Sequence, residues 1–489
     1  MEKFSNEDLY EIFRTRDERY DGRFYVGVKT TGIYCRPVCP AMPKPENCVY
    51  FDSQAAAEKA GFRPCLVCRP ELAPGYAPID SKRNIANTAR ILLEEKMNSE
   101  TVIEDVCKII GCTDRHLRRV FNEEFGVSPI EYIQTCRLLL AKKLLTDTNI
   151  SMTDVAFSSG FGSVKRFNTL FKEKYKLTPT SFRKESKPKK SDEIIIKIGY
   201  KTPYRFDGIL NFLGLRTIEG VEKIKNKAYI RTIQIIKNNN KYRGVIKISN
   251  DKKKSCLNLS ISEELLKVLP EVITKVKNQF DIYSEPNRVY ENLRGINEIA
   301  SGLFEKGTRI PGGIDDFEMC VRAIIGQLVS VKSARTTLRK IVEKFGDKIK
   351  YEGEEMYLFP TANKFINLDT EITNILGPLG ITKTKAYAIK GIAEYLLKNN
   401  ISFNDCLDPN EEIKNLIKIK GIGKWTAEYI SMRTMKNTNI LLDTDYGIKK
   451  VFEKYPKLQN KELQETWNPW KTYITVGLWN YLEQMEEEK

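Results

Sequence analysis

Hydrophobic and polar residues alternate with different periods along the chain. From 82 to about 184, apolar residues recur at the spacing of short amphipathic helices. After a charged, proline-interrupted stretch at 183–193, β-branched residues alternate with polar ones in EIIIKIGY, YIRTIQII and YRGVIKIS, which predicts strands. From about 261 onward the period is again helical. Because 489 residues are too many for one hydrophobic core, these changes indicate several domains.

An internal repeat lies in the first helical stretch. DVCKIIGCTDRHLRRVFNEEFGVSP (105–129) matches DVAFSSGFGSVKRFNTLFKEKYKLTP (154–179). Each copy predicts a helix, a turn around Gly111 or Gly160, and a second helix that stops at a proline. Four positions are expected to face inward: Val106, Phe121, Val155 and Phe171. The pattern predicts two helix-turn-helix units, with a generic repeat of helical hairpins as the alternative.

The second helix of each copy is basic. The side chains predicted to bind DNA there are Arg115, Arg118 and Arg119 in the first copy, and Lys165, Arg166 and Lys172 in the second. Such groups bind guanine edges and phosphates in the major groove. The doubled arrangement resembles the AraC-type DNA-binding domain, whose two motifs occupy successive major grooves. This resemblance covers 82–184 and implies an all-α domain.

The charge balance agrees with a nucleic-acid partner. Lys and Arg outnumber Asp and Glu by 80 to 64, giving a net charge of +16. Lysine codons in an AT-rich genome are the alternative explanation. No apolar run approaches the roughly 20 residues of a membrane span, and the start, MEKFSNEDLYEIF, is unlike a signal peptide. We therefore expect a cytoplasmic protein without membrane contact, whose 11 cysteines are thiols or metal ligands.

Histidine is almost absent, because the chain contains only His116. This scarcity nearly excludes Ser-His-Asp and Cys-His catalysis and histidine-ligated catalytic zinc. Acid–base chemistry must therefore use carboxylates, lysines or thiolates.

Two close cysteine pairs near the start have the spacing of a zinc site. Cys35 and Cys39 are separated by three residues, and Cys65 and Cys68 by two. This spacing suits four thiolates around a tetrahedral Zn²⁺. Cys48 lies between the pairs and is interpreted as a bystander. From spacing alone, a purely structural zinc site is favoured.

The sequence segments that contain these cysteines resemble a known protein family. VKTTGIYCRPVCP and AGFRPCLVCRP resemble the N-terminal domain of Ada-type methylphosphotriester-DNA methyltransferases over most of 4–76. The resemblance implies that Cys35, Cys39, Cys65 and Cys68 bind Zn²⁺, and that Cys35 is the catalytic methyl acceptor. Zinc keeps a thiolate unprotonated at neutral pH. The thioether formed by methyl transfer is not readily converted back to a thiolate, so each protein molecule would act once.

Methylation of Cys35 would also act as a switch. It reduces the net charge of a four-thiolate zinc centre from two negative charges to one. At about 6 Å from a phosphate this relieves roughly 0.7 to 3 kcal/mol, for effective dielectric constants of about 80 to 20. The adjacent helix-turn-helix units would then bind DNA more readily.

A glycine hairpin appears near the other end. IKGIGKWTAEYI, at 419–430, places Gly421 and Gly423 between two helical stretches, which predicts a helix-hairpin-helix. Backbone N–H groups at the following helix start, beside Lys424, would approach a DNA phosphate, often with a bound monovalent cation. An ordinary glycine helix cap is the alternative.

Longer agreement identifies the second half. TPYRFDGILNFLGLRTIEGVE, DDFEMCVRAIIGQLVSV, FPTA, LLDTDYGIKK and WNPWKTYITVGLWNYL resemble 3-methyladenine DNA glycosylase II of the AlkA type over about 194–485. The resemblance implies a small sheet subdomain followed by two helical subdomains that flank a cleft. Asp445 matches the catalytic aspartate, and we expect Asp443 to cap the nearby helix. A carboxylate suits this chemistry because breaking an N-glycosidic bond builds positive charge on the sugar.

The same resemblance assigns the base-binding residues. Trp425 and Trp479 match the walls that receive an extruded base, and an indole face favours a cationic, alkylated one. Tyr429, one helical turn after Trp425, is expected to line the same pocket. Leu328 matches the wedge that fills the vacated stack. For each aromatic residue, ordinary core packing is the alternative. Two further tryptophans are left out of the site: Trp467 and Trp470.

Three motifs that the sequence lacks restrict the reactions expected of the protein. Trp425 occupies the position of the Schiff-base lysine of bifunctional relatives, and the adjacent Lys424 points elsewhere, so strand cleavage is not expected. No cysteine follows Cys406, so no iron–sulfur cluster is expected. The PCHR nucleophile of O6-alkylguanine transferases is missing too, which confines methyl transfer to phosphotriesters.

The sequence thus predicts a multidomain α+β protein of the DNA alkylation response. Its expected parts are a zinc-binding methyl-acceptor domain (1–78), a double helix-turn-helix domain (82–184), a linker (185–193), an antiparallel sheet subdomain (194–280) and a helix-hairpin-helix glycosylase domain (281–489). We expect a monomer that binds damaged and promoter double-stranded DNA and contacts RNA polymerase. It would activate transcription after methyl transfer and release alkylated bases such as 3-methyladenine by hydrolysis. The alternative is a non-enzymatic AraC-like activator whose glycosylase-like part only grips DNA.

Overall fold

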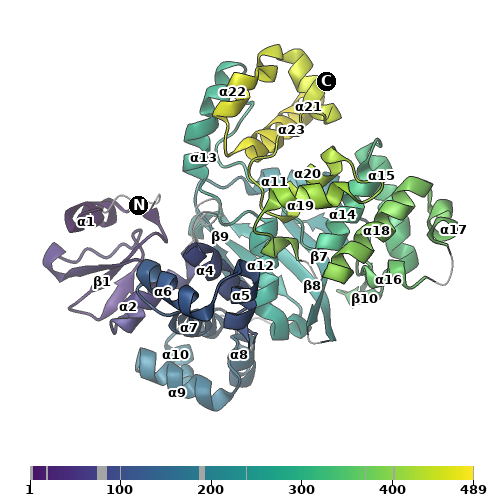
Figure 1. Cartoon of the computed structure of the whole chain (residues 1–489). Helices are drawn as coiled ribbons and strands as arrows, with labels where there is room; N and C mark the ends of the chain where they lie inside the picture. The colour runs from purple at the N-terminus through teal and green to yellow at the C-terminus, as the bar shows by residue number, and fades with distance from the viewer. Residues whose placement is uncertain are drawn as a thin grey trace.

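Four parts follow one another along the chain (Figure 1). The computed structural model describes residues 4–17, 20–73, 85–99, 101–186, 193–237, 239–368, 371–399 and 402–487. We call the parts the cysteine part (4–73), the HTH part (85–186), the sheet part (193–261) and the helical part (263–487). Most of the expected linker, residues 187–192, lies outside the described residues, as do residues 74–78 of the expected first domain.

The cysteine part is a small sheet with two helices. Its elements are α1 (Asn6–Thr15), β1 (Tyr25–Val28), β2 (Ile33–Cys35), β3 (Cys48–Phe51), α2 (Gln54–Lys59) and β4 (Arg63–Pro64). The strand order is β3-β1-β2-β4. β2 and β4 pair in parallel, which brings Cys35, the last residue of β2, close to Cys65, which directly follows β4.

The HTH part is all-α. Its helices are α4 (Ile85–Glu95), α5 (Val102–Ile110), α6 (Asp114–Phe125), α7 (Pro129–Asp147), α8 (Met152–Ser158), α9 (Val164–Tyr175) and α10 (Pro179–Ser186). The four positions expected to face inward are all fully buried: Val106, Phe121, Val155 and Phe171. Gly111 and Gly160 have φ of +74° and +85°, a left-handed conformation that glycine adopts readily. Both predicted turns are confirmed.

The prolines of the repeat have a different role from the predicted one. α6 ends at Phe125 because Gly126 is left-handed, and α9 ends at Tyr175 because Lys176 is left-handed. Pro129 begins the next helix instead of stopping the previous one. A first-turn position suits proline because it needs no N–H donor there.

The sheet part is a five-stranded antiparallel sheet. Its elements are β5 (Ile194–Gly199), α11 (Phe206–Leu215), β6 (Glu222–Lys225), β7 (Ala228–Lys237), β8 (Asn240–Asp251) and β9 (Cys256–Ile261). The strand order is β5-β9-β8-β7-β6. The three predicted strands correspond to β5, β7 and β8. β6 and β9 were not predicted, although Leu257, Leu259 and Ile261 of β9 alternate on the buried face.

The rest of the chain is mainly helical. Its helices are α12 (Leu269–Gln279), α13 (Pro286–Leu293), α14 (Asp316–Gly326), α15 (Val331–Phe345), α16 (Asn363–Ile366), α17 (Ile372–Leu376), α18 (Lys383–Asn399), α19 (Pro409–Ile417), α20 (Lys424–Thr434), α21 (Tyr446–Lys454), α22 (Lys461–Thr466) and α23 (Lys471–Glu487). Short 3₁₀ turns occur in the cysteine, sheet and helical parts: η2 (Pro45–Asn47), η3 (Pro70–Leu72), η4 (Lys252–Lys254), η5 (Glu263–Val268), η6 (Arg294–Glu298), η7 (Gly377–Leu379), η8 (Phe403–Asp405) and η9 (Pro456–Gln459). Among the residues described, no helix has the length and apolar character needed to cross a bilayer.

One hairpin interrupts the predicted helical region. β10 (Lys348–Tyr351) pairs with β11 (Glu354–Tyr357) through a turn at Glu352 and Gly353, both left-handed. Met356 packs on Ile230 and Val245 of the main sheet. This tertiary contact stabilises the hairpin, and no local hydrophobic periodicity predicts it.

Ion pairs join the parts. Arg69, which follows the last cysteine of the zinc motif, donates two hydrogen bonds to Asp147 at the end of α7, at 2.9 and 3.0 Å. Lys197 of β5 donates to the same carboxylate at 2.9 Å. Lys96 and Lys436 form further pairs between the HTH and helical parts, with Asp405 and Glu95. The HTH part therefore lies between the cysteine part and the other two (Figure 1).

Candidate functional sites

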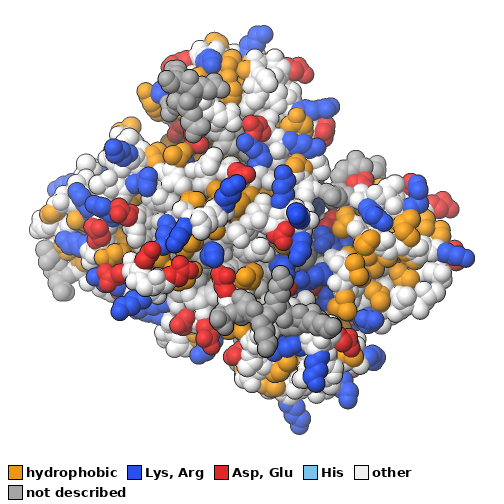
Figure 2. Space-filling view, turned by 180° about the vertical axis from the view of Figure 1, so that it is seen from behind, with side chains coloured by type: hydrophobic (Ala, Val, Ile, Leu, Met, Phe, Trp, Pro, Cys, Tyr) orange, Lys and Arg blue, Asp and Glu red, His pale blue; other side chains and the backbone are white. Residues whose placement is uncertain are grey.

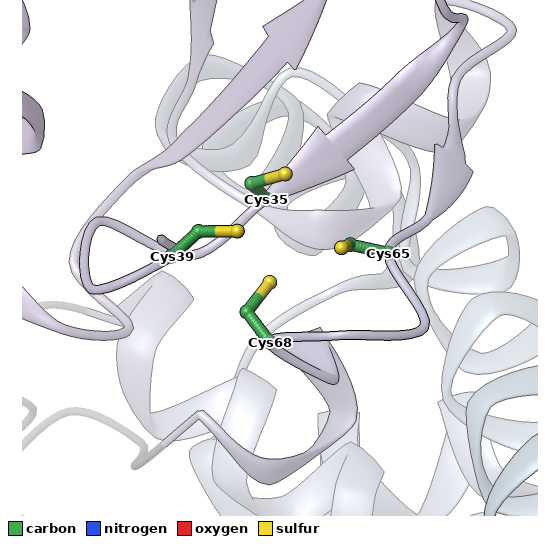
Figure 3. A group of neighbouring side chains, drawn as sticks. All are labelled: Cys35, Cys39, Cys65 and Cys68. Carbon is green, nitrogen blue, oxygen red and sulfur yellow. The ribbon is translucent and has the colours of Figure 1, made fainter. Parts of the chain in front are cut away.

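The four predicted zinc ligands form one group. The Sγ atoms of Cys35, Cys39, Cys65 and Cys68 lie within 4.8 Å of one another, and their side chains point toward a common centre (Figure 3). A tetrahedral Zn²⁺ with bonds of about 2.3 Å requires sulfurs about 3.8 Å apart. The donor set and spacing fit that ion. Cys48 lies in β3 outside this group, as expected for a bystander.

Backbone donors surround the sulfurs. The N–H of Arg36 donates to Cys68 Sγ at 3.3 Å, and the N–H of Val67 donates to Cys65 Sγ at 3.4 Å. Such bonds stabilise thiolates and orient them toward a metal. The Arg36 guanidinium is itself held by Asp21, with Nε 2.9 Å from Oδ1.

The predicted methyl acceptor is covered. Cys35 is only 2% exposed, whereas Cys68 is half-buried. Exposure alone therefore does not favour Cys35 over Cys68 as the acceptor.

The predicted DNA-binding side chains of the HTH part are exposed. Those on α6 are Arg115, Arg118 and Arg119, and those on α9 are Lys165, Arg166 and Lys172. Arg118 and Arg119 pair along their own helix with Asp114 and Glu123, at 2.9 and 3.1 Å. Figure 2 shows basic side chains projecting from the lowest part of the molecule, where α8 to α10 lie.

Asp445 faces a cavity of about 340 Å³ between the helical part and the sheet part. Trp425 and Tyr429 of α20 line this cavity together with Trp479 of α23. The rings of Trp425 and Tyr429 are stacked, with centroids 5.3 Å apart and planes 18° apart. Tyr429 and Trp479 lie 6.2 Å apart. The four residues predicted for base binding and catalysis therefore meet at one hollow.

Asp445 is held by hydrogen bonds. It is the N-cap of α21, and its Oδ1 accepts from the N–H groups of Gly447 and Ile448 at 3.0 and 3.3 Å. The Nε1–H of Trp479 donates to the same oxygen at 3.1 Å. Among the described residues it forms no ion pair. Its carboxylate is therefore not committed to a neighbouring cation of the described chain.

The expectation for Asp443 is wrong. Asp445, not Asp443, caps the helix, because the chain turns between the two residues. Asp443 instead lies 3.7 Å from the exposed Lys461.

The wedge and the hairpin lie next to each other. Leu328, between α14 and α15, is fully exposed and left-handed, with φ of +56°. The neighbouring Gln327 donates from Nε2 to the Gly421 carbonyl at 3.0 Å. Gly421 has φ of +92°, and a Cβ there would lie 3.1 Å from the Thr384 carbonyl. Glycine is needed at this turn both for its conformation and for space.

The second glycine of the hairpin starts α20. Gly423 is its N-cap and has no side-chain cap, so the first N–H groups of the helix remain available for a phosphate. Lys424 is 77% exposed and lies outside the cavity lining.

Two tryptophans belong to the core, as expected. Trp467 and Trp470 are each 2% exposed and lie away from the cavity lining.

Several residues of the cavity escaped the sequence analysis. Arg433 donates to the Tyr429 hydroxyl, and its guanidinium lies 4.9 Å from the Phe212 ring centre. An i, i+4 spacing from Tyr429 was the only available signal. The Trp425 Nε1–H is buried without a hydrogen-bond partner among the described residues. It is a free donor on the wall where a base would stack.

A buried four-residue ion network forms another wall. Its members come from β6, β7 and α14: Glu222, Arg231, Glu318 and Arg322. Despite the cost of burial, Arg231 and Arg322 lower the pKa of Glu318 to about 2. These positions are scattered over about a hundred residues of sequence, so no local pattern indicates them.

Family models match the cysteine part, the HTH part, the sheet part and the start of the helical part. Three family models match: the metal binding domain of Ada at residues 8–71, a helix-turn-helix domain at 106–185, and the AlkA N-terminal domain at 195–315.

Three relatives extend the match. The probable bifunctional transcriptional activator/DNA repair enzyme AlkA of Mycobacterium tuberculosis is 27% identical, over 98% of this chain and 96% of its own. DNA-3-methyladenine glycosylase 2 of Escherichia coli is 29% identical, over 58% of this chain and 95% of its own. The bifunctional transcriptional activator/DNA repair enzyme AdaA of Bacillus subtilis is 32% identical, over 37% of this chain and 84% of its own.

Together, the cysteine group, the paired helix-turn-helix units and the glycosylase part define a DNA-binding protein of the DNA repair class. The chain belongs to the family of Ada-type bifunctional transcriptional activators and DNA repair enzymes, joined here to an AlkA-type glycosylase.

Proposed function

We propose that the helical part hydrolyses the N-glycosidic bond of alkylated bases such as 3-methyladenine, with Asp445 as the catalytic carboxylate. The observation that carries this proposal is the convergence of Asp445, Trp425 and Trp479 on one cavity. The charge of Asp445 would stabilise the cationic sugar as the bond breaks. The aromatic walls would favour a cationic base by about 1 to 2 kcal/mol when desolvated.

The reaction is monofunctional in this proposal. The bond between sugar and base breaks, and the base leaves with the electron pair. Water adds to the sugar as hydroxide, and its remaining proton is released to solvent. A lyase step needs an amine in the cavity. Lys424 is the nearest lysine in sequence to Trp425, and its side chain points to solvent.

A base-release assay on methylated DNA tests the glycosylase. Asp445→Asn should retain the fold, because asparagine also caps helices, and release should fall by at least about a hundredfold. Asp443→Asn is the matched control, two residues away, and should release base at the wild-type rate. Equal release by Asp445→Asn and wild type, or none from either, would show that this assignment is wrong. No release from any form would favour the activator that only grips DNA.

For the cysteine part we propose methyl transfer from a DNA methylphosphotriester to Cys35. The Cys35 Sγ forms a bond to the methyl carbon while the carbon–oxygen bond breaks, and an anionic phosphodiester leaves. Cys35, Cys39, Cys65 and Cys68 would hold Zn²⁺, which keeps the thiolates unprotonated. The methylated protein would then activate transcription through the HTH part and RNA polymerase. We assign Cys35 from its motif, because its burial alone does not favour it over Cys68.

Mass spectrometry tests this assignment. After mixing with a duplex that carries one methylphosphotriester, Cys35 should gain the mass of one CH₂ group. The same label on Cys68 or Cys48, or no label, would contradict it.

Three further proposals, on a bound cation, an iron–sulfur cluster and the oligomeric state, follow from the family resemblance. We propose that the hairpin at Gly421 and Gly423 binds a monovalent cation with a DNA phosphate, that no iron–sulfur cluster is used, and that the protein acts as a monomer. The part boundaries expected from the sequence remain our assignment.

A further inference from the structure

Helix α2 of the cysteine part contacts the ends of both DNA-recognition helices. Ser53, its N-cap, donates from Oγ to the carbonyl of Phe125, the last residue of α6, at 3.1 Å. Tyr175, the last residue of α9, donates from its hydroxyl to Glu58 Oε1 at 3.4 Å. One short helix thus contacts the C-terminal ends of α6 and α9.

The other side of Glu58 faces the zinc group. Tyr34 donates from its hydroxyl to the same Oε1 at 3.0 Å. Tyr34 directly precedes Cys35 in β2, and its carbonyl accepts from the N–H of Cys65 at 3.0 Å. The backbone of Tyr34 is therefore held between two of the four cysteines. A contiguous path leads from the zinc group through Glu58 to the second recognition helix.

This path is fully buried. Tyr34, Glu58 and Tyr175 are 0, 2 and 3% exposed. Glu58 Oε2 has no hydrogen-bond partner among the described residues. A buried carboxyl group is costly compared with an apolar side chain of similar size. Docking of the cysteine part on the HTH part would not require this buried carboxyl group. Its presence points to a role in orienting the elements that it contacts.

Methylation would act on this path at Cys35. The sulfur there loses its charge, becomes a weaker ligand and gains a methyl group at a site that is 2% exposed. Tightly packed interiors transmit such changes because they have few voids to absorb them. The residue that must move with Cys35 is its neighbour Tyr34.

We propose that Glu58 is a positioning residue that conveys the methylation state of Cys35 to α9 through Tyr34 and Tyr175. The gain in promoter affinity on methylation then includes a change in the orientation of the second recognition helix. This inference rests on the proposed methyl transfer to Cys35.

The test compares promoter binding before and after methylation. The probe is the tightest duplex that methylated wild-type protein selects from a random-sequence library. Each variant is methylated with a duplex carrying one methylphosphotriester, and its label on Cys35 is quantified by mass spectrometry. The measured quantity is the ratio of the dissociation constants of the unmethylated and methylated forms.

Tyr175→Phe should reduce this ratio by about fivefold, the factor that corresponds to one buried hydrogen bond. Tyr132→Phe is the matched control. It also removes a buried tyrosine hydroxyl that donates to a glutamate, Glu94 at 2.7 Å, but that pair lies within the HTH part. Its ratio should equal that of the wild type. Glu58→Gln keeps the acceptor oxygen and should preserve the ratio as well.

The outcomes separate the two proposals. Full labelling of Cys35 with equal ratios in Tyr175→Phe and wild type would overturn this inference alone. Absence of label on wild-type Cys35 would overturn the proposed methyl transfer and this inference with it. Should Tyr175→Phe fail to fold, Tyr34→Phe breaks the same path from the zinc side and must reduce the ratio instead.

Discussion

At the scale of single residues, the candidate sites depend on a few side chains whose neighbours decide their chemistry. Asp445 is both a helix cap and the carboxylate of the cavity, because its Oδ1 accepts three N–H donors. The motif identified Asp445, but the cap was expected at Asp443. A sequence motif specifies residue types at intervals, whereas which of two nearby carboxylates caps a helix depends on where the chain turns.

The protonation of Glu58 should make the stability of the protein depend on pH. Burial raises the pKa of Glu58 to about 7. Four neighbours oppose this shift and lower the pKa: Tyr34 from β2, Lys174 and Tyr175 from α9, and Lys142 from α7. The folded pKa exceeds the unfolded value, so the stability from the neutral form is fully present below about pH 4.5. It is lost as the pH rises through about 7.

The free energy of unfolding of the full chain should therefore fall by about 1 kcal/mol from about pH 6 to about pH 8 because of this group. Chemical denaturation of zinc-loaded wild type and Glu58→Gln at both pH values measures it. The glutamine variant should lack this component. An identical pH response in both proteins would contradict the assigned pKa.

At the scale of elements, two turns present the groups proposed to contact DNA. The loop between α14 and α15 exposes Leu328 completely, and the turn before α20 leaves helix N–H groups open. Exposed apolar residues in a left-handed conformation are uncommon in a fold. The structure thus supports a contact role for this loop that the sequence could indicate only through family resemblance.

Leu328→Ala should leave the thermal midpoint unchanged, since the side chain buries no surface in the free protein. Release of alkylated bases from duplex DNA should fall by about tenfold, because the wedge compensates a few kcal/mol of unstacking. Release from single-stranded DNA should change little. Leu397→Ala, at another exposed leucine on α18, is the control and should match wild type on both substrates. A similar loss on both DNA forms would argue against a wedge.

At the scale of the whole molecule, buried charges join parts that the sequence suggested were separate. Asp147 accepts hydrogen bonds from Arg69 of the cysteine part and from Lys197 of the sheet part, and its side chain is 2% exposed. A regulator flanked by flexible linkers would not need such a junction. The three parts are therefore expected to unfold together.

Asp147→Asn tests this junction. Removing the charge leaves two cations without their common anion and should destabilise the protein by about 3 kcal/mol. Calorimetry should show one transition in the wild type and separate transitions in the variant. Glu193→Gln removes a partly exposed pair with Lys247 at 3.2 Å and should cost less than about 1 kcal/mol. A single transition in Asp147→Asn at the wild-type temperature would contradict the coupling.

Much of the architecture is local, and such features were predictable. The helix-turn-helix repeat and three strands follow from hydrophobic period, because period decides which face of an element is buried. The zinc ligands follow from the spacing of cysteines, and the aromatic cavity walls from resemblance to the glycosylase family. β10 and β11 escaped because Met356 is buried by the main sheet, a contact between residues over a hundred positions apart.

The sequence by itself determined the composition of this protein: four cysteines at metal-binding intervals, two basic recognition helices, and an aspartate between two tryptophans of a helical domain. Only the tertiary structure decided how these parts touch. Glu58 between Tyr34 and Tyr175, and Asp147 between Arg69 and Lys197, unite residues from separate parts of the chain. Periodicity and spacing report on neighbours along the chain, whereas burial and charge pairing depend on neighbours in space.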